Sequence, residues 1–325
     1  MGSNRLTPPM LSLKDLIYSY PGQPKPALNE LSLSVQKETI FGILGPNGGG
    51  KSTTFKILST LIRPDKGSVE INGIDVIKSP DKVRSLLGIV FQSPALDKKL
   101  TVEENLHHQG HLYGIKGKLL EDRTTFLLKR LGLWEKRNEK TENLSGGQKR
   151  RLEITKSLIH EPQILILDEP TTGLDPLARR EVWNYLKFLR ETEKITILVT
   201  THLLEEAEDC DEIALIDQGR VVCEGRPSQL RHEMGSDLVS IRTSYPSELR
   251  ENIRSKFDVS SSNLGNQLRV QPKDLESFVS YLVKEGSSKI DNFTVGKPTL
   301  EDLFIEKTGH HFWIEKSGKD SEVTA

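Results

Sequence analysis

The sequence predicts an α/β fold with an inserted helical region, followed by a smaller α+β domain. Short apolar runs rich in Ile, Leu and Val alternate with helix-like segments from residue 11 to about residue 230. Such runs suit strands that are buried on both faces of a parallel sheet. A polar, helix-rich stretch interrupts this alternation at about residues 93–160, and strand and helix patterns resume after Gly235.

The first domain is expected to span residues 11–232. We expect strands at residues 31–35, 39–44, 68–71, 87–91, 164–167 and 196–200, and a helix that starts at Lys51. Residues 213–217 and 220–224 flank Gln218-Gly219, so they are expected to form a hairpin.

Helical spacing predicts a subdomain inserted into this core at about residues 93–160. Thr101 and Glu104 have the spacing of a capping box before a helix that runs to about residue 113. Leu120, Leu127 and Leu131 follow a second helical pattern.

The last third of the chain predicts a second domain over residues 235–315. Strand-like residues 238–243, 267–271 and 290–295 alternate with two helical patterns, and a last helix follows Thr299. This order suits a small α+β sandwich, of which the ferredoxin-like fold is one example. Residues 1–10 and 316–325 are polar and expected to be disordered.

Composition disfavours several functions. The chain of 325 residues has 45 Lys and Arg against 46 Asp and Glu, a net charge of −1, so it lacks the basic excess of a nucleic-acid binder. Its two cysteines, Cys210 and Cys223, form no metal spacing and fit a reducing compartment. The first ten residues lack the apolar core of a signal peptide, and no stretch approaches the ~20 apolar residues that cross a bilayer. Any membrane work is therefore expected to go through a partner.

A glycine-rich loop between a strand and a helix is the clearest motif. It consists of Gly45, Pro46, Asn47, Gly48, Gly49, Gly50, Lys51 and Ser52, which fits the P-loop pattern. Glycines let successive N–H groups point at phosphate oxygens, and the helix N-terminus adds its positive dipole end. Lys51 is expected to reach the β- and γ-phosphates of ATP, Ser52 to ligate Mg²⁺, and Thr53 to support the α-phosphate.

Two acidic residues follow the apolar run at 164–167. Taken alone, Asp168-Glu169 could be a solvated turn at the end of a strand. With the P-loop present, we expect Asp168 to hold Mg²⁺ through water. Glu169 is then expected to accept a proton from the attacking water.

Leu144-Ser145-Gly146-Gly147-Gln148 resembles the signature sequence of ABC ATPases, and residues 11–230 are similar to that family throughout. The resemblance implies a P-loop NTPase core with an antiparallel β edge. It also implies that Ser145, Gly146, Gly147 and Gln148 of one copy close over the γ-phosphate held by a second copy. Locally, Ser145 and Gln148 have capping-box spacing at a helix N-terminus, which is itself an anion site.

Four further residues match the family in order. The resemblance implies that Gln92 contacts Mg²⁺ and the attacking water, that Asp175 belongs to the D-loop, and that His202 contacts the γ-phosphate. Tyr20 would stack on adenine, although Tyr18 could take its place. Gly49 departs from the family, which more often has Ala, Ser or Cys there.

Residues 92–106 and 298–304 resemble multidrug and daunorubicin-resistance ATPases, which pair with ABC-2 type permeases, usually as exporters with two copies of each subunit. This implies a peripheral subunit at the cytoplasmic face of the membrane. The apolar Leu96, Leu100 and Val102 are hypothesised to meet a cytoplasmic helix of the permease.

The main alternative is an ABC ATPase of translation or DNA repair. The chain has one cassette and lacks both heptads and zinc-spaced cysteines, which disfavours that alternative. A non-catalytic nucleotide-binding regulator would be expected to lack Glu169 or His202, and both are present.

Overall fold

The computed structural model describes residues 8–235, 237–259, 261–264, 267–284, 290–310 and 312. The chain divides into two compact units, Met1–Glu224 and Gly225–Ala325. Residues 1–7 and 316–325, for which disorder was predicted, lie outside the described residues. The prediction was wrong for Met10, which is only 5% exposed and donates its N–H to the Val35 carbonyl at 2.8 Å.

A six-stranded sheet forms the centre of the first unit. Its order is β10 (Arg220–Gly225), β9 (Glu212–Asp217), β3 (Ile40–Leu44), β8 (Thr196–Thr201), β7 (Ile164–Asp168) and β6 (Leu87–Val90). The strands from β9 to β6 are parallel. Every residue of β3, β7 and β8 is buried, which confirms that these apolar runs are central strands covered on both faces.

An antiparallel sheet packs beside this core. Its order is β2 (Leu28–Val35), β1 (Leu11–Tyr18), β4 (Lys66–Ile71) and β5 (Ile74–Asp75). One hydrophobic cluster joins the two sheets through α1 (Lys51–Leu58), with Leu16 from β1, Phe55 from α1 and Ile166 from β7. The P-loop helix is therefore held between two layers.

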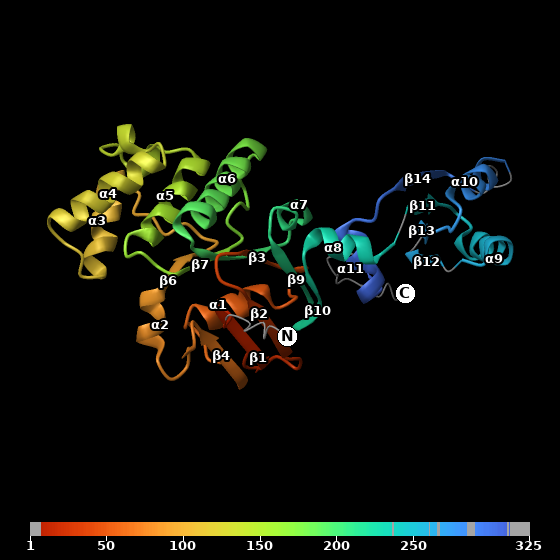
Figure 1. Ribbon diagram of the computed structural model, residues 1–325, viewed down its shortest axis with the longest axis horizontal. Helices are drawn as coiled ribbons and strands as arrows, with labels where there is room; N and C mark the ends of the chain where they lie inside the picture. Colours follow the sequence, from red (N-terminus) through yellow and green to blue (C-terminus); the bar gives the residue numbers. More distant parts are fainter. Residues whose placement is uncertain are drawn as a thin grey trace, which may run out of the picture. The chain divides into compact units, whose positions relative to one another are not determined.

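Three helices, α3 (Val102–Leu112), α4 (Lys118–Arg130) and α5 (Gly146–Leu158), gather near the β6 edge of the central sheet (Figure 1). The predicted capping box starts α3, since Thr101 and Glu104 exchange backbone-to-side-chain hydrogen bonds of 2.7 and 3.2 Å. In α4, Leu128 is fully buried and Leu127 is half-buried, one position away from the predicted pattern. The other helices of this unit are α2 (Pro80–Leu86), α6 (Pro176–Glu193) and α7 (Leu204–Ala207), with 3-10 turns at Trp134–Lys136 and Thr141–Asn143.

The second unit has the order helix, then βαββαβ, then helix. Its elements are α8 (Pro227–Glu233), β11 (Leu238–Arg242), α9 (Pro246–Phe257), β12 (Ser261–Leu264), β13 (Gln267–Val270), α10 (Leu275–Lys284), β14 (Asn292–Gly296) and α11 (Leu300–Thr308). The sheet is antiparallel in the order β12-β13-β11-β14. The βαββαβ succession is that of a ferredoxin-like fold. Its core includes Ile241, Leu268 and Phe278.

The boundary between the units differs from the predicted one at residues 232–235. Helix α8 belongs to the second unit, where it packs against α11. Among the described helices, none combines the length and the apolar character needed to cross a bilayer.

Candidate active site

The loop between β3 and α1 folds back on its own lysine. Lys51 is 4% exposed, and its Nζ donates to the carbonyls of Gly45 at 2.8 Å and Pro46 at 3.1 Å. Burial lowers the pKa of Lys51, and the charges of Glu169 and Asp168 oppose that shift. The ammonium thus lies in the cradle that the P-loop forms, and the neighbouring Ser52 side chain is exposed.

Two of the loop glycines have no room for a side chain. Gly50 has φ 112°, and a Cβ there would lie 2.9 Å from Leu28 and 3.0 Å from the Ala27 carbonyl. A Cβ at Gly45 would lie 2.3 Å from the Ile216 carbonyl oxygen. Between them, residues 46–49 form a turn closed by the Gly49 N–H on the Pro46 carbonyl at 3.1 Å. Asn47 and Gly48 lie within this turn, and Gly48 has φ 79°.

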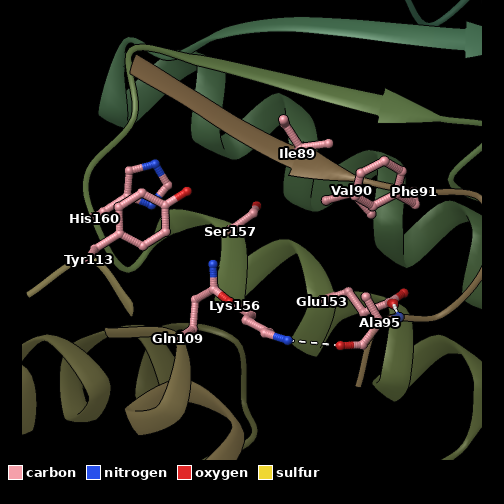
Figure 2. Close-up of a pocket in the computed structure, with 10 residues that line it drawn as sticks. All are labelled: Ile89, Val90, Phe91, Ala95, Gln109, Tyr113, Glu153, Lys156, Ser157 and His160. Carbon is pink, nitrogen blue, oxygen red and sulfur yellow. Dashed lines mark hydrogen bonds between the residues drawn. The ribbon is translucent and has the colours of Figure 1, made fainter. Parts of the chain in front are cut away.

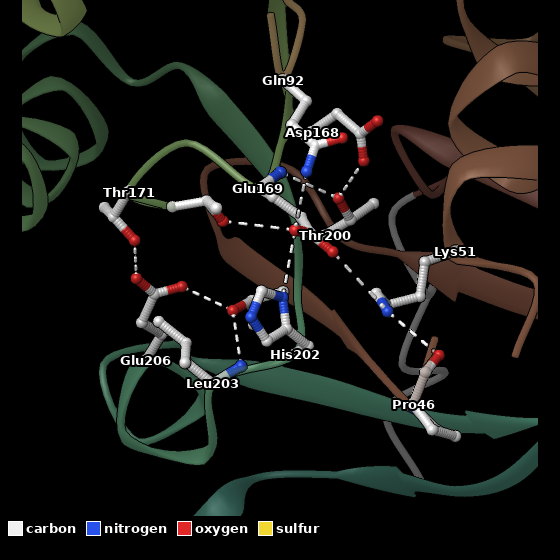
Figure 3. Close-up of polar contacts among 12 residues, drawn as sticks. Pro46, Lys51, Gln92, Asp168, Glu169, Thr171, Thr200, His202, Leu203 and Glu206 are labelled. Atoms are coloured by element: carbon white, nitrogen blue, oxygen red, sulfur yellow. Dashed lines mark hydrogen bonds and ion pairs between the residues drawn. The ribbon is translucent and has the colours of Figure 1, made fainter. Parts of the chain in front are cut away.

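Asp168 ends strand β7 and Glu169 follows it, so both acids lie at the carboxyl end of the sheet, beside the P-loop (Figure 3). Asp168 accepts a hydrogen bond of 2.5 Å from the Thr200 hydroxyl of β8. Burial raises the pKa of Asp168, and the Thr200 hydrogen bond opposes this. Glu169 has φ 45°, a left-handed conformation that a non-glycine residue rarely adopts outside functional sites.

The Glu169 carboxylate is the meeting point of the predicted site. Its Oε2 accepts from Gln92 Nε2 at 3.2 Å and lies 3.0 Å from His202 Nδ1. Its Oε1 lies 3.7 Å from the Lys51 ammonium. Thr172, which the sequence did not single out, donates to Oε2 at 3.2 Å. The structure therefore brings together Lys51, Gln92 and His202 around one carboxylate that is 9% exposed.

The signature residues start α5 with a capping box. Ser145 N–H donates to Gln148 Oε1 at 3.0 Å, and Gln148 N–H donates to Ser145 Oγ at 3.3 Å. A Cβ on Gly147 would lie 2.8 Å from the Cβ of Ala178, so glycine permits α5 and α6 to approach closely. Within the described part of one copy, no hydrogen bond joins Ser145 or the exposed Gly146 to the P-loop.

Asp175 caps the next helix. Its carboxylate accepts the Ala178 N–H at 2.9 Å at the start of α6. Asp175 is exposed, as is the neighbouring Leu177, which is 70% exposed.

Two tyrosines were candidates for an adenine platform. Their rings meet edge to face at 5.0 Å, and the Tyr20 hydroxyl reaches the P-loop helix. Its hydroxyl lies 3.3 Å from Thr53 Oγ1, and the Lys56 ammonium lies 5.5 Å from its ring centroid. Tyr18 packs against the hydrophobic core instead. This geometry favours Tyr20.

Arg150 connects several backbone segments of the site, and the sequence did not single it out. This buried residue of α5 donates to the carbonyls of Phe91 at 2.7 Å and Pro170 at 2.5 Å, and pairs with Glu153 at 2.9 Å. Weaker hydrogen bonds of 3.3 and 3.4 Å reach the carbonyls at 168 and 169. The signature helix is thereby fixed to the backbone that carries Gln92 and Glu169. The i,i+3 pair of Arg150 and Glu153 was the sequence signal.

The side chains proposed for Mg²⁺ fit that ion by their chemistry. Ser52, Gln92 and Asp168 offer a hydroxyl, an amide and a carboxylate oxygen, the hard donors that Mg²⁺ prefers. Gln92 uses its Nε2 on Glu169, which leaves its Oε1 for a cation. Among the described residues, no group of three or more His, Cys, Asp or Glu forms a separate metal site.

The three apolar residues predicted to face a permease behave differently. Val102 is fully buried as the first residue of α3, so the hypothesis was wrong for it. Leu96 and Leu100 are partly exposed. Ala95, the residue before Leu96, lines a cavity of about 220 Å³ between β6, α3 and α5 (Figure 2). Phe91, Ala95, Tyr113 and Lys156 are among the residues that line it.

Residues 28–172 match the family described as ABC transporter, and residues 225–308 match the C-terminal domain of DrrA1-3-like ATP-binding proteins. The daunorubicin resistance ATP-binding protein DrrA3 of Streptomyces coeruleorubidus is 36% identical over 88% of this chain and 92% of its own length. The linearmycin resistance ATP-binding protein LnrL of Bacillus subtilis is 35% identical over 88% of this chain and 94% of its own.

Solved structures agree with the family matches. CbiO1 from Clostridium perfringens, part of an ABC transporter complex, superposes with a TM-score of 0.65 at 28% identity, over 78% of this chain and 97% of its own. An ATP-binding cassette in a dimeric post-hydrolysis state, bound to ADP and Pi, superposes with a TM-score of 0.60 at 30% identity. The match covers 67% of this chain and 98% of the cassette's own chain. The chain therefore belongs to the ATP-binding subunits of ABC transporters, and it is an ATPase.

Proposed function

We propose that this ATPase powers export through a separate ABC-2 type permease at the cytoplasmic face of the membrane. Relatives named for daunorubicin and linearmycin resistance support a role in export. So does the Nod factor export ATP-binding protein I of Ralstonia nicotianae, which is 41% identical over 72% of each chain. The DrrA1-3-like second unit supports the same subclass.

The P-loop would bind the phosphates of ATP. Lys51 exchanges its hydrogen bonds with the Gly45 and Pro46 carbonyls for phosphate oxygens, while backbone N–H groups of the loop and of α1 surround the same anion. Tyr20 stacks on the base. Ser52, Gln92 and Asp168 hold Mg²⁺, which supplies positive charge to the phosphate oxygens.

The arrangement around Glu169 is the observation that carries the mechanism. Gln92 and His202 lie at 3.2 and 3.0 Å from one oxygen of this carboxylate, so the base and two polar groups already converge. Glu169 takes a proton from the attacking water, Gln92 orients that water, and His202 contacts the γ-phosphate.

The reaction would use two copies of the chain. Ser145 and Gly146 are exposed at the N-terminus of α5, and Asp175 and Leu177 are exposed at the start of α6. A second copy can cover these residues and place its own P-loop phosphate at the signature helix N-terminus. The dimeric cassette with ADP and Pi supports this arrangement.

The permease would dock at the cavity beside β6. Phe91 and Tyr113 are 38% and 41% exposed at this cavity, and Phe91 directly precedes Gln92. A cytoplasmic helix of the permease seated here would contact the segment that carries Gln92. Apolar and aromatic side chains with a few polar groups suit a helix inserted into a groove.

Site-specific photo-crosslinking would test the partner. A photoreactive residue at Tyr113, in cells that also express a six-helix ABC-2 type permease, is expected to capture that permease. The same residue at Val283 of the second unit, which is 59% exposed, provides the control. Capture of ribosomal protein or DNA from position 113 would contradict the proposal.

A further inference from the structure

Glu206 is a buried acid outside the residues assigned above. It lies on the short helix α7, four residues after His202, and is 2% exposed. Burial raises the pKa of Glu206, and the hydrogen bond from Thr201 and the charge of Arg179 oppose that shift. Burying a carboxyl group costs free energy unless the group is hydrogen-bonded, so the hydrogen bonds to Glu206 offset the cost of its burial.

Each carboxylate oxygen of Glu206 accepts a hydrogen bond from a different segment beside the active site (Figure 3). The Thr201 hydroxyl, at the end of β8, donates to Oε2 at 2.5 Å. The Thr171 hydroxyl, just after the Asp168-Glu169 pair, donates to Oε1. Arg179 of α6 lies 4.0 Å from the same Oε1. One side chain therefore joins three elements.

Two hydrogen bonds hold the loop around His202 in place. Leu203 N–H donates to Thr201 Oγ1 at 3.0 Å, so the Thr201 hydroxyl proton is left for Glu206. Glu206 thus holds Thr201, immediately before His202, directly, and it holds Leu203, immediately after His202, through the Thr201 hydroxyl.

The other oxygen fixes the turn that leads to Asp175. Leu174 N–H donates to the Thr171 carbonyl at 3.1 Å. Thr172, which directly follows Thr171, donates its hydroxyl to the Glu169 carboxylate. Thr171 is 1% exposed, so little solvent reaches this link.

We propose that Glu206 is a positioning residue for ATP hydrolysis, which holds the His202 loop and the turn from Thr171 to Asp175 in one fixed arrangement. This rests on the roles proposed above for His202 and Asp175. A movement of His202 at the γ-phosphate would then be transmitted through Glu206 to the turn that ends at Asp175, which faces the second copy. Glu206 itself would not contact ATP. A mere structural role would change stability and leave turnover intact.

The test compares kcat, KM for ATP and Tm for Glu206→Ala, Glu206→Gln and Thr201→Val. Loss of the link is expected to lower kcat by about tenfold or more in Glu206→Ala and Thr201→Val, with KM nearly unchanged, because small misplacements of reacting groups are costly. Glu206→Gln is expected to restore most of kcat, because an amide accepts from Thr201 and donates to Thr171.

Thr124→Val is the matched control. Thr124 is fully buried in α4, and its hydroxyl has no hydrogen-bond partner among the described residues, so the same change removes no bond. It is expected to leave kcat at the parent value. If Thr201→Val lowers Tm but leaves kcat unchanged, the positioning role is overturned.

A double-mutant cycle with His202→Ala decides how Glu206 acts. If Glu206 works through His202, Thr201→Val should lower kcat by no more than about twofold when His202→Ala is already present. If the two losses multiply in full, the proposal is overturned while the role of His202 stands. If His202→Ala alone leaves kcat unchanged, the role of His202 in the proposed function fails, and the positioning role falls with it.

Discussion

The ammonium of Lys156 donates a hydrogen bond of 2.8 Å to the carbonyl of Ala95 (Figure 2). One turn earlier on α5, Glu153 accepts the Ala95 N–H at 2.5 Å. Ala95 lies three residues after Gln92, so the helix that begins with the signature holds the segment that carries Gln92 through both backbone polar groups of Ala95. The same residues line the cavity proposed to receive the permease.

Lys156→Met is expected to loosen this segment. Loss of one hydrogen bond costs roughly 1 kcal/mol, so local opening around Ala95 should become about fivefold more frequent. Hydrogen–deuterium exchange of a peptide that covers residues 92–98 measures it. Lys149→Met is the control, since Lys149 is also on α5 and donates to a different carbonyl, that of Glu142. Equal exchange in both variants would refute the link.

Arg150→Met is expected to destabilise the first unit by about 3–5 kcal/mol, because it leaves Glu153 buried without its cation. Urea unfolding measures the loss. Arg151→Met is a neighbouring control: Arg151 pairs with a half-exposed Glu181 at 3.2 Å, and such a pair contributes about 0–1 kcal/mol. A similar midpoint for the two variants would contradict the assignment of Arg150 as the buried centre.

Tyr20→Ala is expected to weaken ATP binding by roughly 5- to 150-fold, because stacking of a base on an aromatic ring contributes about 1–3 kcal/mol. Tyr18→Ala is expected to lower Tm with a smaller effect on ATP, since Tyr18 packs on the core. Titration with a fluorescent ATP analogue separates the two. A larger affinity loss in Tyr18→Ala would reverse the assignment.

The two cysteines are expected to differ in reactivity. Burial raises the pKa of Cys210 well above its ordinary value, so its thiolate fraction at pH 8 falls below that of a free thiol. Cys223 is partly exposed. A thiol reagent should therefore label one equivalent in the native protein and two in denaturant. Fast labelling of two equivalents in the native protein would show that the Cys210 region is open.

Much of the core could be predicted because the P-loop motif and the apolar runs place the central strands at the same positions. The central strands at 164–167 and 196–200 are uninterrupted apolar runs, and the P-loop follows such a strand, so both could be placed from the sequence. Strand β1 was not identified. Its alternation breaks between Leu13 and Leu16, where Asp15 has φ 48° and the register shifts. A local irregularity of this kind conceals the period of two on which strand prediction depends.

The residues that meet at Glu169 were identifiable from their motifs, but the contacts that support them were not. Arg150 acts through the carbonyls of Phe91 and Pro170, and Glu206 through the hydroxyl of Thr171, all far away in the sequence, so spacing along the chain carries no information on these contacts. Thr172 lies only three residues after Glu169, but the motif that contains Glu169 does not include it. Val102 was misplaced for a similar reason. It stands in a polar segment, yet as the first residue of α3 it points into the helical subdomain.

The central claim is that Glu169 is the base of a site shared by two copies. Glu169→Gln should bind ATP, because Lys51 and the P-loop backbone are unchanged, while hydrolysis falls by about 10²- to 10⁴-fold. The intact γ-phosphate should then keep two copies closed over it. Adding Ser145→Arg should prevent closure and serves as the control.

The most direct measurement is the mass of Glu169→Gln by size-exclusion chromatography with light scattering, with and without ATP, beside its turnover rate. We predict a monomer without ATP, a dimer with ATP, and slow turnover. Turnover at the parent rate would show that Glu169 is not the base. A monomer in ATP despite slow turnover would contradict the shared site.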